Sequence, residues 1–426
     1  MKTLRADILA IGSELLHGGR VDSNSLFIAD LLAHCGIRVN KKMALSDEQA
    51  DIQAALKASS KKVDVVILTG GLGSTIDDRT REAVAAAFGR PLSVRRKAIQ
   101  ILNRQIQSRG RTVTSLLTNQ AFIPSGATVL ENFVGTAPGF YIQEGESHVF
   151  ALPGVPREAR EMMEHQVQPI LKRKLRATAF LWSHAFNTMG AKETDIQQRL
   201  SPLFQKSSDM TLSLLASTKG VKVTLSRWCS ANKKLTHSNA SEFFPEGNFL
   251  IQQVRKALEP WLFSEGAETM EEVIGKLCSS HKWKLALAES CTGGLIAYRL
   301  TEVPGSSAYL DRGVVTYSNK AKQELLGVSP WILRRHGAVS VQVAEAMAKG
   351  VREKSGVDLG VSVTGIAGPG GGSAKKPVGL VYMAIDGPRG SQSQRCQFWG
   401  NRTEIKLRAS QAALDMIRRY LLQVKG

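Results

Sequence analysis

The sequence predicts an α/β protein built from more than one domain. Its 426 residues exceed the length of one ordinary domain, and a hydrophobic share of 43% is enough for packed cores. Aromatic residues make up only 6% while glycines number 38, a balance typical of aliphatic strands joined by glycine-rich loops. Strand and helix patterns alternate near both ends of the chain, which indicates βαβ units and largely parallel sheets.

The N-terminal part begins with a predicted strand, helix and second strand, at residues 6–11, 23–35 and 63–69. The second strand ends at a Gly-Gly-Leu-Gly turn, residues 70–73. We expect the next helix to begin near Asp77. Asp78 and Glu82 would then lie in its first turn, where carboxylates interact favourably with the helix dipole.

Further along, the pattern changes to a small α+β connector and then returns to α/β. The connector is predicted to have strands at 179–189, 211–216 and 221–228, a helix at 193–203 and a polar run at 230–241. The last part is predicted to have helices at 268–279 and 403–422 and strands at 284–288, 359–364 and 378–385. We therefore divide the chain into domains 1–172, 173–264 and 265–426.

The net charge of +19 attracts anions of every kind. Part of it lies in two basic runs, residues 95–111 and 172–176, and neither contains the interleaved aromatic side chains of many nucleic-acid surfaces. We interpret both runs as solvated helix faces. The charge alone favours phosphate-bearing small molecules no more than DNA.

Five cysteines stand singly with no Cys-x-x-Cys pair, which argues against a disulfide framework or a zinc site. The first residues run directly into a strand pattern and lack a signal-peptide core. No apolar run approaches the roughly 20 residues of a membrane helix. We therefore expect a soluble, cytoplasmic protein with no membrane partner.

A serine-containing turn joins the strand at 284–288 to a helix, with the sequence Ser290-Cys291-Thr292-Gly293-Gly294. The unpaired amides of a helix N-terminus can stabilise an oxyanion, which makes Ser290 a candidate nucleophile. The alternative is that Ser290 only caps the helix, as serine often does.

A serine nucleophile needs a base, and no histidine stands in a recognisable motif. The segment 316–322 offers Tyr317, Lys320 and Lys322 behind a strand. A lysine removed from water beside the serine would have a lowered pKa and could act as the base. The alternative is a pair of surface lysines at the start of a helix.

A loop with almost no side-chain bulk, residues 364–372, follows the strand at 359–364. Its backbone amides could approach a phosphate closely. No Gly-Lys-Ser/Thr follows, so the loop is not a Walker A motif, and a flexible surface turn is an equal alternative.

Together these segments resemble one family. Ala-Glu-Ser-Cys-Thr-Gly-Gly (288–294), Val-Thr-Tyr-Ser-Asn-Lys-Ala-Lys (315–322) and Ser-Val-Thr-Gly-Ile-Ala-Gly-Pro-Gly-Gly (362–371) are similar to the three signatures of the CinA C-terminal domain, a family of nicotinamide mononucleotide deamidases. The resemblance covers about residues 267–422. It implies Ser290 as nucleophile, with Tyr317 and Lys322 assisting proton transfer and Lys320 as the other possible base.

The same resemblance implies that deamidation needs no cofactor and that the substrate is a pyridine nucleotide. The implied substrate site consists of Cys291, Thr292, Gly293, Gly294, Thr364, Gly365, Ala367, Gly368, Gly370 and Arg402. Arg402 matches a family arginine and would bind phosphate in a bidentate manner.

Glycines and carboxylates also cluster in the N-terminal part, in segments 11–18, 21–24 and 68–78. Such carboxylates can hold a magnesium-type ion, which in turn holds phosphates. The alternative is that Asp77, Asp78 and Glu82 only cap a helix. Residues 5–170, with segments 132–140 and 152–158, resemble the molybdopterin-binding-like domain that precedes the deamidase domain in CinA proteins.

In some relatives this domain is implicated in metal-dependent ADP-ribose pyrophosphatase activity. The implied N-terminal nucleotide site consists of Gly12, Glu14, Asn24, Asp47, Gly70, Gly71, Gly73, Asp78 and Glu82. A divalent metal such as Mg²⁺ would bind Asp47 and Asp78.

The sequence thus predicts an amidohydrolase that converts nicotinamide mononucleotide to nicotinate mononucleotide and ammonia in pyridine-nucleotide salvage, with a second pyrophosphatase site. Three alternatives stay open: only the deamidase works, only the pyrophosphatase works, or the protein is a non-enzymatic accessory factor for DNA uptake or recombination. The resemblance implies a homodimer. An intact serine, tyrosine and lysine set argues against nucleic acid as the main partner.

Overall fold

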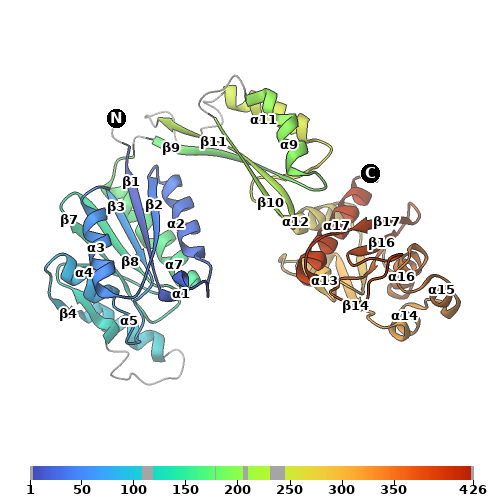
Figure 1. Ribbon diagram of the computed structural model, residues 1–426, viewed down its shortest axis with the longest axis horizontal. Coiled ribbons are helices and arrows are strands. Elements are labelled where there is room, and N and C mark those ends of the chain that lie inside the picture. The colour runs from blue at the N-terminus through green and yellow to red at the C-terminus, as the bar shows by residue number, and fades with distance from the viewer. Residues whose placement is uncertain (1–2, 108–118, 178, 205–209, 231–244, 424–426) are drawn as a thin grey trace. The chain divides into compact units, whose positions relative to one another are not determined.

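The computed structural model describes residues 3–107, 119–177, 179–204, 210–230 and 245–423 (Figure 1). Residues 231–241 of the polar run and 108–111 of the first basic run lie outside these ranges. The chain divides into two compact units, Met1–Trp182 with Arg227–Pro245, and Ser183–Ser226 with Glu246–Gly426. The division into three domains at 172/173 and 264/265 stays a prediction.

A six-stranded sheet of order β2-β1-β3-β8-β7-β6 forms the centre of the first unit. The first four strands are parallel and the last two pair antiparallel. The strands are β1 (Arg5–Ile11), β2 (Arg38–Leu45), β3 (Val65–Thr69), β6 (Thr128–Leu130), β7 (Gly139–Glu144) and β8 (Ser147–Leu152), beside a separate pair β4 (Leu92–Val94) and β5 (Phe122–Pro124).

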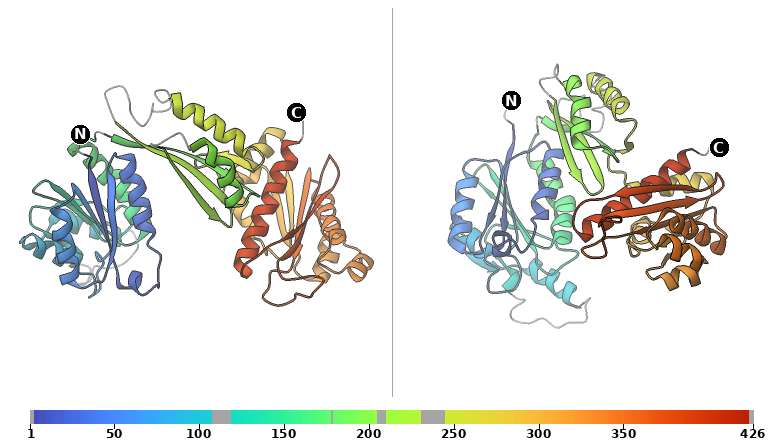
Figure 2. Two further views of the ribbon diagram at one scale, coloured as in Figure 1. Left: turned by 45° about the horizontal axis from the view of Figure 1, so that its top comes forward. Right: turned by 45° about the vertical axis from the view of Figure 1, so that its right-hand side comes forward.

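Helices cover both faces of this sheet (Figures 1 and 2). One face packs against α2 (Ser23–His34), α7 (Pro156–Met162) and α8 (Gln168–Lys174), and the other against α3 (Gln49–Ser60), α4 (Thr80–Ala87) and α5 (Arg96–Gln107). β3 is buried along its whole length, which explains its unbroken aliphatic sequence. A short helix, α1 (Ser13–Leu16), follows β1.

The predicted strands at 6–11 and 63–69 and the helix at 23–35 are confirmed. The predicted helix start near Asp77 is wrong, because α4 begins at Thr80. Asp78 lies before the helix, and its carboxylate accepts hydrogen bonds from the amides of Gly73 and Thr75 at 2.8 Å each. Asp78 therefore shapes the loop, and of the two carboxylates expected in the first turn only Glu82 lies there.

The connector of the second unit is an antiparallel sheet of order β10-β11-β9-β12. Its elements are β9 (Ala179–Thr188), α9 (Glu193–Phe204), β10 (Thr211–Ser217), β11 (Gly220–Ser230), α11 (Pro245–Leu258) and β12 (Leu262–Glu265). The predicted connector strands and helix are thus confirmed. The division between the two units passes through β9 and β11.

A five-stranded sheet of order β14-β13-β15-β16-β17 forms the rest of the second unit. β14, β13 and β15 are parallel. β16 pairs antiparallel with β15, and β17 pairs antiparallel with β16. The strands are β13 (Leu285–Glu289), β14 (Leu310–Val315), β15 (Leu359–Gly365), β16 (Leu380–Asp386) and β17 (Gln392–Gln397). Each strand and helix predicted here from the sequence is confirmed within a few residues.

Two groups of helices enclose this second sheet. One face packs against α12 (Met270–His281), α13 (Leu295–Thr301) and α17 (Arg402–Leu422). The other packs against α14 (Asn319–Leu326), α15 (Pro330–His336) and α16 (Val341–Ser355). The protein therefore has the predicted α/β fold class with an antiparallel connector.

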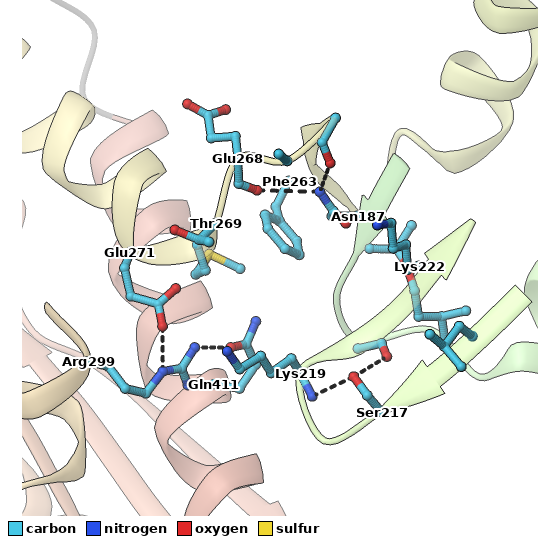
Figure 3. Close-up of a pocket in the computed structure, with 17 residues that line it drawn as sticks. Asn187, Ser217, Lys219, Lys222, Phe263, Glu268, Thr269, Glu271, Arg299 and Gln411 are labelled. Atoms are coloured by element: carbon cyan, nitrogen blue, oxygen red, sulfur yellow. Dashed lines mark hydrogen bonds and ion pairs between the residues drawn. The ribbon is translucent and has the colours of Figure 1, made fainter. Parts of the chain in front are cut away.

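A cavity of about 250 Å³ lies between the connector strands and α12, α13 and α17 (Figure 3). Arg299 lies at its edge, almost buried. Its guanidinium pairs with Glu271 at 2.6 Å and donates to Ser410 at 2.9 Å and Gln411 at 2.5 Å. These partners satisfy the arginine within the protein, so the cavity wall is part of the packing between three helices.

We expect Glu271→Ala to destabilise the second unit by about 3–5 kcal/mol, because it leaves the buried Arg299 charge without its carboxylate. Urea unfolding followed by circular dichroism measures the change. Lys349→Ala is the control, since it breaks an exposed 3.7 Å pair with Glu353 and should change stability by less than about 1 kcal/mol. Equal effects of the two substitutions would contradict the structural role of Arg299.

Candidate functional site

Three loops of the second unit meet at one edge of its parallel strands. β14, β13 and β15 are neighbours, so their carboxyl ends lie at the same edge. The Ser290 turn follows β13, the segment 316–322 follows β14, and the glycine-rich loop follows β15. The sheet topology therefore brings together the three segments that the sequence singled out.

Ser290 and Lys322 form a hydrogen-bonded pair at this edge. The Nζ of Lys322, on α14, donates to Ser290 Oγ at 3.1 Å and to the backbone oxygen of Thr316 at 2.7 Å. Ser290 is 8% exposed and Lys322 only 1%. Lys320 lies in solvent, with its side chain 81% exposed and its Nζ 3.7 Å from Glu324. Of the two lysines, Lys322 is the one that contacts the serine.

The environment of Lys322 favours its neutral form. Burial lowers the pKa of Lys322 below the ordinary value of 10.5, while the nearby Cys291 raises it to a smaller extent. Among the described residues, Lys322 has no carboxylate partner. Its neutral amine is therefore more accessible near neutral pH than that of a surface lysine, as a general base requires.

Glu289, which the sequence analysis did not single out, caps the helix behind the serine turn. Its buried carboxylate accepts hydrogen bonds from the amides of Gly294, Ile296 and Ala297, at 3.0, 3.2 and 2.9 Å. Negative charge at a helix N-terminus is stabilising, so Glu289 fixes the geometry of α13 relative to β13.

This capping changes two expectations for the turn. Gly294 is the N-cap of α13, so the interpretation of Ser290 as a helix cap is wrong. The helix amides that we expected to face an oxyanion already bind Glu289, and Gly293 donates to the backbone oxygen of Ser290 at 3.1 Å. The amides of Cys291 and Thr292 are the remaining oxyanion donors in the predicted set.

Arg402, in the first turn of α17, joins the other two loops. One of its terminal nitrogens donates to the backbone oxygen of Gly368 at 2.7 Å and the other to the hydroxyl of Tyr317 at 2.8 Å. Tyr317 is 60% exposed. Because its oxygen accepts from Arg402, its own O–H can donate to another group. The terminal nitrogens expected to bind phosphate thus already have protein partners.

The other predicted substrate-site residues lie on the same loops with mainly structural contacts. Thr292 is fully buried, and its hydroxyl has no partner among the described residues. Thr364 donates to a backbone oxygen of the α15–α16 loop at 2.9 Å. A side chain on Gly365 would collide with β16, whereas nothing lies within 4 Å of a Cβ on Gly370. Ala367 packs into the core beneath the loop.

Two lysines at this edge were missed by sequence reasoning. Lys376 donates from its Nζ to the backbone oxygens of His336 and Val339, at 2.8 and 2.7 Å, and so ties down the end of the glycine-rich loop. Lys406 follows Arg402 by one helical turn and lies beside Gly293. Neither stands in a motif that marks it from sequence alone.

A small pocket of about 80 Å³ lies at the carboxyl edge of β1 and β3 in the first unit. Glu14 and Asn24 line it as predicted, together with Arg20, which sequence reasoning missed. Asn24 donates to Thr69 Oγ1 at 2.9 Å and to the backbone oxygen of Gly154 at 3.0 Å. Asn24 thereby links α2 to the ends of β3 and β8.

The remaining predicted N-terminal residues do not line that pocket. Gly70 has a φ of 109°, and a Cβ there would lie 2.1 Å from the backbone oxygen of Ile11, so the turn requires glycine. Arg81 is buried and donates to the backbone oxygens of Leu72 and Gly73 at 2.7 and 2.9 Å. The predicted residues that do not line the pocket are Gly12, Asp47, Gly70, Gly71, Gly73, Asp78 and Glu82.

The predicted metal ligands are engaged in other bonds. Asp47 accepts a hydrogen bond from the amide of Ser13 at 2.8 Å, and Asp78 binds the loop amides described above. Within the described ranges, no three His, Cys, Asp or Glu side chains form a group that could hold a metal ion. The described residues therefore do not fit a ready-made metal site at Asp47 and Asp78.

Three general expectations have structural counterparts. The described lysines and arginines of both basic runs are exposed or half-buried on α5 and α8 and in their flanks, as expected for solvated faces. All five cysteines are free thiols. In the described part of the chain, no helix has the length and apolar character needed to cross a membrane.

The fold and the site define an α/β protein with a serine–lysine pair at the carboxyl edge of its C-terminal sheet. Residues 267–421 match the model of the CinA C-terminal domain, and residues 7–173 match the model described as "Probable molybdopterin binding domain". The chain belongs to the CinA family.

Relatives match this chain over nearly its whole length. A CinA-like protein of Geotalea uraniireducens is 38% identical, with 98% of each chain covered. A CinA-like protein of Geobacter sulfurreducens is 39% identical, covering 97% of this chain and 98% of its own. The crystal structure of competence/damage inducible protein CihA from Agrobacterium tumefaciens is 44% identical over 38% of this chain and 100% of its own, with a TM-score of 0.35.

We expect Lys322→Met to make the folded protein more stable, because it removes a buried amine that has no carboxylate partner. The folded-state pKa lies below the unfolded value of 10.5, so the buried charge costs most at low pH. The gain should therefore be largest below the folded-state pKa and shrink as the pH rises toward 10.5. Urea midpoints at several pH values test this, with exposed Lys320→Met as control. A pH-independent gain would contradict it.

Proposed function

We propose that the C-terminal domain hydrolyses the carboxamide of nicotinamide mononucleotide to nicotinate mononucleotide and ammonia, a step of pyridine-nucleotide salvage. The observation that carries the proposal is the 3.1 Å hydrogen bond between Ser290 Oγ and the Nζ of buried Lys322. The resemblance of this domain to nicotinamide mononucleotide deamidases supports the choice of substrate. The reaction needs no cofactor.

In the first step, the neutral amine of Lys322 takes the proton of the Ser290 hydroxyl while Oγ attacks the carboxamide carbon. The resulting oxyanion would bind the amides of Cys291 and Thr292. The carbon–nitrogen bond then breaks, and the proton on Lys322 passes to the leaving nitrogen, which departs as ammonia. Tyr317, whose oxygen accepts from Arg402 and whose O–H is left as a donor, can assist this transfer.

In the second step, water attacks the acyl ester on Ser290 and gives up a proton to Lys322. The ester bond breaks, Lys322 returns that proton to Ser290 Oγ, and the product forms as a carboxylic acid, which loses its remaining proton to solvent water. The same lysine therefore acts as base and acid in both halves of the reaction.

We expect Ser290→Ala to abolish ammonia release from nicotinamide mononucleotide, and Lys322→Met to lower kcat by about 100- to 10,000-fold. Lys320→Met is the matched control, because this lysine lies in solvent two residues away and should leave kcat unchanged. A coupled ammonia assay measures all three variants. Full activity of Ser290→Ala would refute the serine mechanism, and loss in Lys320→Met alone would show that the wrong lysine was chosen.

A second proposal concerns the pocket lined by Glu14, Arg20 and Asn24 in the first unit. A carboxylate, a guanidinium and an amide at one sheet edge can bind a nucleotide through its sugar hydroxyls and phosphates. Whether this domain also splits ADP-ribose with a divalent metal stays a prediction. The present carboxylates give no ready-made metal site for that reaction.

We expect AMP release from ADP-ribose in the presence of Mg²⁺ to fall at least about tenfold in Glu14→Gln, since the pocket loses a charged hydrogen-bond acceptor. Asp78→Asn is a poorer probe because Asp78 shapes its own loop. If the folded wild type releases no AMP from ADP-ribose, the deamidase is the single enzymatic function that remains proposed. If ammonia release also fails, a steep salt dependence of DNA binding would favour the accessory-factor alternative.

A further inference from the structure

Arg402 already forms hydrogen bonds within the protein at the Ser290 site. Both of its terminal nitrogens have partners, the backbone oxygen of Gly368 and the hydroxyl of Tyr317. A guanidinium used in this way sets the positions of two loops. Two of its five N–H groups are used in this way, so a substrate phosphate could accept only from the three that remain, in the orientation that the two loop contacts fix. The edge therefore needs another cation if it is to bind a phosphate well.

Lys406 is a cation in the right place. It follows Arg402 by four residues on α17, so both side chains leave the same face of the helix. Its Nζ lies 3.5 Å from the position that a Cβ on Gly293 would occupy. Lys406 is half-buried, and it has no hydrogen-bond or ion-pair partner among the described residues.

The position of Gly293 places this ammonium close to the serine. The amide of Gly293 donates to the backbone oxygen of Ser290 at 3.1 Å, which closes a tight turn. The two ends of such a turn lie within about 7 Å of each other. Because Gly293 has no side chain, the Nζ of Lys406 approaches the backbone of the turn directly, and it is the nearest atom that a Cβ at Gly293 would meet.

We propose that Lys406 binds the phosphate of the mononucleotide and makes the site select phosphorylated substrates. This inference rests on the proposed deamidase function, and it assigns to Lys406 a contact that Arg402 cannot fully supply. The pyridine ring that bears the carboxamide and the phosphate are attached to two different carbons of one ribose, so the two groups lie at opposite ends of the molecule. With the carboxamide at Ser290, an unpaired ammonium at the far end of the same turn meets the phosphate.

The competing role for Lys406 is stabilisation of the oxyanion. The ammonium would then act on the reacting carboxamide, which every nicotinamide substrate contains. The two roles differ in what happens when the phosphate is removed from the substrate. Nicotinamide riboside has the same carboxamide and ribose but no phosphate, so it separates the two roles directly.

The test compares wild type, Lys406→Ala and Lys406→Arg on nicotinamide mononucleotide and on nicotinamide riboside. We expect Lys406→Ala to raise KM for the mononucleotide by about 10- to 100-fold with kcat nearly unchanged, the loss of one charge-assisted hydrogen bond. kcat/KM for the riboside should not change. Lys406→Arg should restore most of the affinity for the mononucleotide. Lys349→Ala, which removes an exposed charge elsewhere in the unit, should behave as wild type.

An equal loss on both substrates would overturn the proposal in favour of the oxyanion role, and no loss on the mononucleotide would overturn it outright. Melting curves show whether Lys406→Ala is folded. If this variant does not fold, Lys406→Arg, which keeps the positive charge, is compared with wild type instead. If wild type releases no ammonia, the proposed function fails, and titration calorimetry with the mononucleotide still decides the role of Lys406. Binding that weakens in Lys406→Ala and recovers in Lys406→Arg supports it, and unchanged or absent binding overturns it.

Discussion

The burial of one lysine without a carboxylate partner is the constraint on which the C-terminal site depends. Among the described residues, Lys322 has only neutral oxygens as partners, those of Thr316 and Ser290. Removing an ammonium from water without a counter-charge is costly, so the protein favours the neutral amine. A carboxylate beside it would keep the lysine protonated. In the proposed mechanism, this costly burial is what makes Lys322 available as a base.

The carboxylate of Glu289, next to Ser290 in the sequence, does not hold Lys322 in its charged form. Glu289 directly precedes Ser290, but both of its oxygens accept hydrogen bonds from amides of α13. Its charge is used to stabilise the helix N-terminus, not to hold the lysine in its charged form. Ser290 is consequently free of the capping role that serine often takes at this position. Glu289 thus fixes the start of α13, and the Ser290 hydroxyl is left to Lys322, the contact on which the proposed mechanism rests.

The sequence predicted the parts of the fold that depend on local pattern. The aliphatic runs before Gly70 and Ser290 identified β3 and β13, and the alternation of elements identified the sheet edge where strands end. Features set by distant residues were not predictable. Nothing in the sequence near Arg402 shows that its nitrogens meet Gly368 and Tyr317. The start of α4 was misplaced because an acidic pair can cap a helix or close a loop, and only the folded backbone decides between them.

The same physical reasoning explains why a serine rather than the adjacent cysteine suits this turn. A thiol is intrinsically the better nucleophile, but only as a thiolate. Burial raises the pKa of Cys291 to about 12, and a backbone hydrogen bond and the nearby lysines oppose this shift only in part. The thiol therefore stays protonated at neutral pH and packs in the core below the turn. Ser290 is the residue whose oxygen contacts the Lys322 amine, so the proposed mechanism selects its nucleophile by access to a base rather than by intrinsic nucleophilicity.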